Sequence, residues 1–155
     1  MLHRLRQRSS DESGFTLIEL LVVVLIIGIL AAIAIPSLLS QKAKAYDASA
    51  KELVRSAFTT AETYATDHEG KYEGLTLAEL HKYEATIPTS SAAANGGAYV
   101  EAPTVASAGE ELTLTAVAAS TGDKFSIIRK PTGEVERTCK AASTSNVGGC
   151  PNKTW

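Results

Sequence analysis

The 155-residue sequence has few of the residues that build metal sites or bind nucleic acid. Its two cysteines and three histidines are scattered, so they cannot form the closed four-ligand site of structural zinc, and we expect no metal or other cofactor. With 15 basic and 17 acidic residues, the chain has a net charge of −2, and no specific nucleic acid partner is predicted. Aromatic residues make up only 6%, which argues against electron conduction.

The sequence also lacks the groupings that mark an active site. No nucleophile, base and orienting group can be recognised together, and no glycine-rich phosphate loop follows a predicted strand. We therefore expect no enzyme activity. The length suits one modest domain with an appendage, since single domains usually contain about 100 to 150 residues.

The large aliphatic residues are concentrated near the N-terminus. Between Phe15 and Ile35 the only clearly polar residues are Thr16 and Glu19. A helix over this stretch would be about 30 Å long, which matches the hydrocarbon core of a bilayer. We therefore predict a membrane-spanning helix at residues 15–35.

The segment before the apolar run predicts its orientation. Arg4, Arg6 and Arg8 favour a cytoplasmic N-terminus by the positive-inside rule. A conventional secretory signal is the alternative, because such signals also start with basic residues and residues 32–34 (Ala-Ile-Ala) satisfy a small-x-small cleavage pattern. This alternative fits less well, since Glu19 interrupts the run and the run exceeds the usual length of about 7 to 15 residues.

The sequence SGFTLIEL at residues 13–20 resembles the class III leader of type IV prepilins and pseudopilins. In that family a membrane aspartic protease cuts after the glycine and N-methylates the new terminal phenylalanine. The resemblance covers about residues 1 to 60. It implies a cleaved leader at residues 1–14, cleavage between Gly14 and Phe15, and methylation of Phe15.

The same resemblance implies a role for Glu19 in assembly. A charge inside an apolar span is costly, which suggests that it has a partner. In pilin-like filaments a neighbouring subunit's glutamate neutralises the incoming N-terminus, so Glu19 of one copy would face the Phe15 ammonium of another. The alternative is that Glu19 reaches the headgroup region or caps the start of its own helix.

The helix is predicted to continue beyond the span. Pro36 removes a backbone donor and predicts a kink or a loosened turn. Apolar residues then recur with a helical period, and Gly70 provides a C-terminal stop. We predict one helix from about Phe15 to Thr66, with an amphipathic half at residues 36–69. Charged residues fill much of its remaining circumference: Lys42, Lys44, Asp47, Lys51, Glu52, Arg55 and Glu62.

Residues 70–155 are predicted to form a globular head. Its first part, residues 71–110, is predicted as a connection with one short helix at residues 75–83, where Thr76 and Glu79 have capping-box spacing. A Ser-, Ala- and Gly-rich segment at residues 85–97 predicts an exposed loop.

The second part of the head changes to an alternating pattern. Three strands are predicted at residues 112–117, 125–129 and 135–139, with turns at residues 121–123 and 130–133. We therefore expect these strands to form an antiparallel sheet that covers the amphipathic half of the helix. The expected fold class is α+β, and the resemblance implies the type IV pilin-like arrangement.

The two cysteines, Cys139 and Cys150, lie on the outer side of the membrane in this topology, where a disulfide persists. Gly148 and Gly149 would let the chain turn back between them. We predict a disulfide, and many pilins close a C-terminal loop in this way. Two free thiols or a metal-binding pair are the alternatives.

The resemblance implies a structural subunit of a type IV pilus-like extracellular filament. Its partners would be other copies of itself, the prepilin peptidase, the inner-membrane assembly machinery and, before assembly, membrane lipid. It would lie in the cytoplasmic membrane first and in the surface filament afterwards. The alternatives are a pseudopilin or minor pilin of a type II secretion or DNA-uptake machine, and a monomeric bitopic protein.

Overall fold

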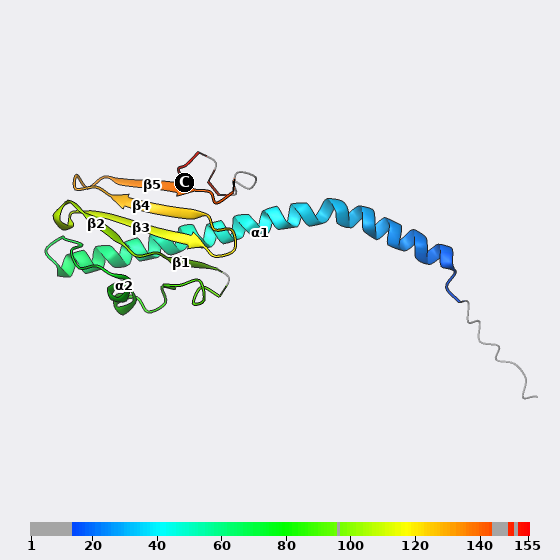
Figure 1. Ribbon diagram of the computed structural model, residues 1–155, viewed down its shortest axis with the longest axis horizontal. Coiled ribbons are helices and arrows are strands. Elements are labelled where there is room, and N and C mark those ends of the chain that lie inside the picture. Colours follow the sequence, from blue (N-terminus) through cyan, green and yellow to red (C-terminus); the bar gives the residue numbers. More distant parts are fainter. Residues whose placement is uncertain (1–13, 96, 144–148, 151) are drawn as a thin grey trace, which may run out of the picture. The chain divides into compact units, whose positions relative to one another are not determined.

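The computed structural model describes residues 14–95, 97–143, 149–150 and 152–155, so the leader arginines and Gly148 lie outside it. The chain divides into two compact units, Met1–Ser37 and Leu38–Trp155. Helix α1 (Leu17–Asp67) supplies residues to both (Figure 1). It confirms the predicted long helix to within two residues at either end. Pro36 lies inside α1, and the predicted kink there stays a prediction.

The second unit contains an antiparallel sheet (Figure 1). Its strands are β1 (Ala98–Val100), β2 (Thr104–Ala106), β3 (Glu111–Ala118), β4 (Lys124–Arg129) and β5 (Val135–Lys140). The order is β1-β3-β4-β5, and β2 also pairs with β3. The three predicted strands correspond to β3, β4 and β5, and the expected α+β fold is confirmed.

The prediction for residues 71–110 was wrong in missing two strands. Both β1 and β2 contain three residues, too few to display an alternating pattern. They exist because β3 is long enough to pair with both, as in the registers Tyr99 with Val117 and Val105 with Leu112. A short 3₁₀ helix, η1 (Ser107–Gly109), then leads into β3.

The short helix α2 (Leu77–Tyr83) starts two residues later than predicted. The Thr76 hydroxyl accepts a hydrogen bond from the Glu79 amide at 3.2 Å, which confirms the expected N-cap. Leu80 on its inner face is fully buried. Leu77 and Tyr83 also pack against the core, and together these apolar contacts anchor a helix that is too short to be stable alone.

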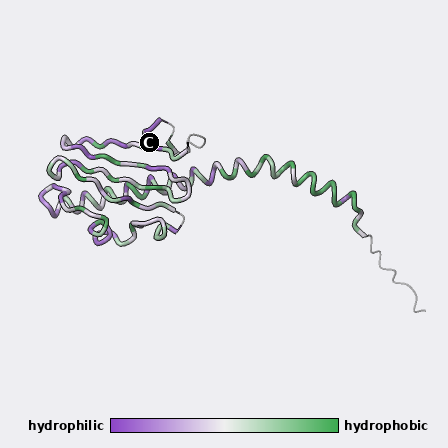
Figure 2. Tube along the Cα trace, in the orientation of Figure 1, coloured by the Kyte–Doolittle hydropathy of each residue, from purple (hydrophilic) through white to green (hydrophobic). Residues whose placement is uncertain are grey.

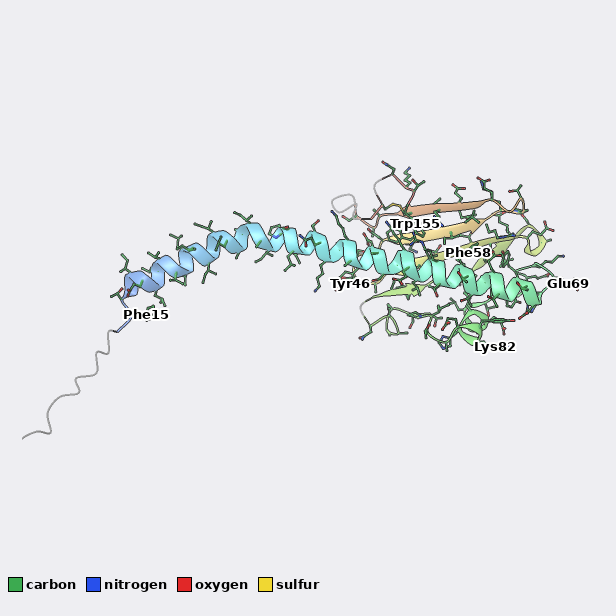
Figure 3. The ribbon with its side chains drawn as sticks, turned by 180° about the vertical axis from the view of Figure 1, so that it is seen from behind. Phe15, Tyr46, Phe58, Glu69, Lys82 and Trp155 are labelled. Atoms are coloured by element: carbon green, nitrogen blue, oxygen red, sulfur yellow. A yellow bond between two sulfur atoms is a disulfide. The ribbon has the colours of Figure 1, made fainter. Side chains whose placement is uncertain are left out.

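The core of the second unit lies between α1 and the sheet. Small residues on the inner stripe of α1, including Ala50, Ala57 and Ala61, are fully buried. They let the helix approach the large side chains of the sheet, such as Phe125 and Leu114. Figure 3 shows Phe58 on the part of α1 that crosses the sheet. The amphipathic stripe is thus the core-facing surface that its period predicted.

Candidate functional site

The most exposed apolar surface of the chain is the N-terminal part of α1. The large apolar side chains from Phe15 to Leu39 have exposed fractions between 48% and 82%. Figure 2 shows this stretch in the colour of the most hydrophobic residues. It is the part of the described chain that is long and apolar enough to cross a membrane, by length and composition. Soluble monomers rarely leave such a surface open, so a bilayer or other protein chains must cover it.

Glu19 is the acidic residue within this apolar surface, and it takes part in a capping box. Its Oε2 accepts hydrogen bonds from the Thr16 amide at 2.9 Å and from the Thr16 hydroxyl at 2.6 Å. The Thr16 hydroxyl in turn accepts from the Glu19 amide at 3.3 Å. These reciprocal bonds satisfy amides that the helix start leaves free.

The capping box bears on the role of Glu19. Within a single chain the carboxylate caps its own helix, which was the alternative considered from the sequence. Only Oε2 is engaged in these bonds. Phe15, where the processed chain would begin, lies four residues before Glu19, outside the helix, and is 82% exposed. The predicted cleavage and methylation positions and the contact between copies stay predictions.

A second set of functional groups lies in the head, where the C-terminal segment meets α1. Asp47 was predicted to lie on the charged outer face of the helix, and this was wrong, because its side chain is fully buried. Its two carboxylate oxygens accept hydrogen bonds from the Thr121 hydroxyl at 3.0 Å and from the Gly149 amide at 2.8 Å. These hydrogen bonds from residues distant in the sequence allow the carboxylate to be buried.

Lys51, one turn further along α1, holds the same segment. Its Nζ donates to the Gly149 carbonyl at 2.7 Å and lies 5.1 Å from the centre of the Phe125 ring. The predicted disulfide between Cys139 and Cys150 is present. Together these contacts fasten the segment around Gly149 to both the helix and the sheet.

Trp155 was not singled out from the sequence. Its Nε1 donates to the Thr138 carbonyl at 2.9 Å, and its ring meets Phe125 edge to face at 6.1 Å between centroids. A single tryptophan after a cysteine carries no periodic signal, so only the tertiary structure reveals this role.

Asp123 is the second buried carboxylate of the head. It accepts a hydrogen bond from the Ala142 amide at 2.7 Å. Burial raises the pKa of Asp123, and the neighbouring Asp47 carboxylate raises the pKa further. Two carboxylates buried side by side make the ionised state of Asp123 less favourable than it is in water.

This raised pKa predicts a pH dependence of stability. Because it exceeds the ordinary value of 3.8, the folded chain binds the Asp123 proton more tightly than the unfolded chain does. The resulting stabilisation is complete below pH 3.8 and is lost as the pH rises through the raised pKa. As the pH rises through the raised pKa of Asp123, the melting temperature of wild-type protein should therefore fall relative to that of Asp123→Asn. Melting curves of the full chain in detergent micelles measure this difference. A difference that is constant with pH would contradict the assignment.

The comparisons with known proteins agree with this geometry. A family model described as "Prokaryotic N-terminal methylation motif" matches residues 9–35. Type IV major pilin protein PilA of Myxococcus xanthus is 43% identical over 66 residues, which are 43% of this chain and 30% of that protein. Fimbrial protein EcpC of Eikenella corrodens is 35% identical over 116 residues, 72% of this chain and 65% of that protein.

A third relative is the type IV wide pilus major component PilA4 of Thermus thermophilus. It is 43% identical over 58 residues, which are 37% of this chain and 44% of that protein. The chain thus spans less than two thirds of the length of each of these relatives. No solved structure gave a significant match.

The N-terminal part of α1 is apolar and exposed, and the rest of α1 packs on the sheet of the head. This arrangement is typical of subunits that are anchored in a membrane or form filaments. The methylation motif and the pilin relatives show that the chain is similar to proteins of the type IV pilin family.

Proposed function

We propose that the chain is a structural subunit of a type IV pilus-like filament, assembled through the N-terminal part of α1. The observation that carries this proposal is the exposed apolar surface from Phe15 to Leu39, which begins directly after the junction at Gly14. Before assembly this surface lies in lipid. In the filament the same surface of other copies replaces the lipid, since lipid and neighbouring apolar helices both suit its apolar side chains.

Processing at the junction prepares the helix for this transfer. The leader, residues 1–14, carries arginines that hold it on the cytoplasmic side of the membrane. Cleavage after Gly14 removes these charges and leaves Phe15, with a methylated amine, as the first residue. Glycine suits the cleaved bond because it has no side chain to obstruct the protease.

The chain is thus proposed to have four parts: the leader at residues 1–14, the membrane and filament-core helix at 15–35, the amphipathic half-helix at 36–69 and the head at 70–155. Its partners are the prepilin peptidase, the assembly machinery of the inner membrane and further copies of itself. The proposed route runs from a single-pass membrane precursor to the cell surface.

Identification of the main protein in filaments sheared from the cell surface tests this proposal. We expect this chain to be the dominant component, and a strain without it should have no such filaments. Its recovery only as a trace component of filaments built from another protein would favour the minor pilin alternative. Its recovery only as a membrane monomer would contradict the filament proposal.

A further inference from the structure

Three cationic side chains of the head surround one aromatic ring. The Arg55 Cζ, the Arg137 Cζ and the Lys51 Nζ lie 4.9, 5.6 and 5.9 Å from the centre of the Trp155 indole. Arg55 and Arg137 are exposed, while Trp155 is half-buried. We call these four residues the basic cluster. The indole holds the three charges in place by cation–π attraction.

No residue of the basic cluster forms an ion pair with another residue that the structure describes. The ion pairs in the described part of the chain involve Lys82, Lys124, Arg129 and Lys130. None of them includes a residue of the cluster. Three positive charges gathered within one small area repel one another, so a negatively charged partner would bind there favourably.

The opposite charge gathers where α1 ends. Asp67, Glu69 and Glu73, with His68 and Lys71, line a hollow of about 370 Å³. The backbone turn at Gly109 packs against Glu73, which brings the exposed Glu110 to the same end of the head. We call Asp67, Glu69, Glu73 and Glu110 the acidic hollow. Figure 3 shows Glu69 at the C-terminal end of α1, whereas Trp155 lies further back along the helix, between Tyr46 and Phe58.

The carboxylates of this hollow are available to a partner. Among the described contacts, the Glu69, Glu73 and Glu110 side chains have no hydrogen bond or ion pair, and Asp67 accepts only the Tyr83 hydroxyl at 2.9 Å. In the described residues no three histidine, cysteine or acidic side chains are placed to hold a metal ion. A concave site lined by carboxylates suits the planar fork of a guanidinium.

We propose that the basic cluster of one copy docks on the acidic hollow of a second copy of this chain. The inference rests on the proposed filament function and adds a contact between heads. Both surfaces belong to one compact unit, and Lys51 and Asp67 are 16 positions apart on α1, about 24 Å along its axis. A parallel copy displaced along that axis brings the opposite charges together, and the contact then repeats once for every subunit.

Charge reversal with rescue tests this contact in the full chain. Arg55→Glu with Arg137→Glu should lower the yield of sheared filaments about tenfold, because it places like charges against each other. Adding Glu69→Lys and Glu73→Lys to the same chain restores opposite signs and should return the yield to within about threefold of wild type. The control Lys82→Glu with Lys130→Glu makes the same change in net charge outside both surfaces and should leave the yield unchanged.

Yields are compared at equal amounts of disulfide-linked precursor in the membrane, and Arg55→Gln with Arg137→Gln serves as a milder second variant. Wild-type yield from both double variants would overturn the inference. A loss that the compensating lysines do not repair would also overturn it, and salt-dependent binding of a nucleic acid oligonucleotide by wild type alone would then identify a polyanion as the occupant. Absence of filaments in wild type would instead refute the proposed filament function.

Discussion

Replacing Glu19 with glutamine should lower the filament yield at least about tenfold while leaving the precursor in the membrane. Glutamine can keep the capping box with Thr16, because this motif accepts either residue at its fourth position. In the proposed filament, it removes only the charge that would face the Phe15 ammonium of another copy. The change also makes the span more apolar, so insertion should not suffer. Quantitative immunoblotting of membrane and sheared fractions measures both effects.

Thr16→Ala is the matched control for this experiment. It removes the hydroxyl that bonds with the Glu19 amide and carboxylate, but it keeps the charge. If the charge is what matters, Thr16→Ala should assemble nearly as well as wild type. The reverse pattern, with normal filaments from Glu19→Gln and few from Thr16→Ala, would show that Glu19 serves only to cap its own helix.

Loss of the disulfide is expected to have the largest effect on the stability of the head. Cys139 and Cys150 are separated by 11 positions, and closing a loop of this size stabilises a protein by about 3 kcal/mol. The bridge also supports neighbouring contacts, such as the hydrogen bond from the Cys139 amide to the Lys153 carbonyl at 2.7 Å. The double variant Cys139→Ser/Cys150→Ser should therefore unfold at clearly lower denaturant concentration.

Denaturant unfolding of the full chain in detergent, followed by tryptophan fluorescence, measures this change, since Trp155 lies beside the bridge-bearing strand. Reduction of wild-type protein should reproduce the loss, whereas reductant should not alter the serine variant. Equal stability of wild type and variant would mean that the polar contacts of Asp47 and Lys51 hold the segment without the bridge.

Most of the elements that the sequence predicted have a periodic pattern. Helix α1 repeats its apolar stripe over many turns, and buried residues alternate with less buried ones along much of β3 and β4. Such patterns depend only on which side chains must face a core. The strands β1 and β2 depend instead on pairing with β3, which no local pattern displays.

The candidate sites divide in the same way. The Thr16–Glu19 capping box has a fixed local spacing and was already an alternative from the sequence. Asp47 is buried by Thr121 and Gly149, which lie 74 and 102 positions away. The basic cluster likewise joins residues from α1, β5 and Trp155. Contacts over such separations appear only once the chain has folded.

Intact mass analysis of the subunit from purified surface filaments tests the central claim most directly. The account predicts a chain that begins at Phe15, carries one additional methyl group at its N-terminus and retains the disulfide between Cys139 and Cys150. A chain that begins at Ile35 would mean ordinary removal of a secretory signal together with the apolar helix. That result would contradict assembly through α1.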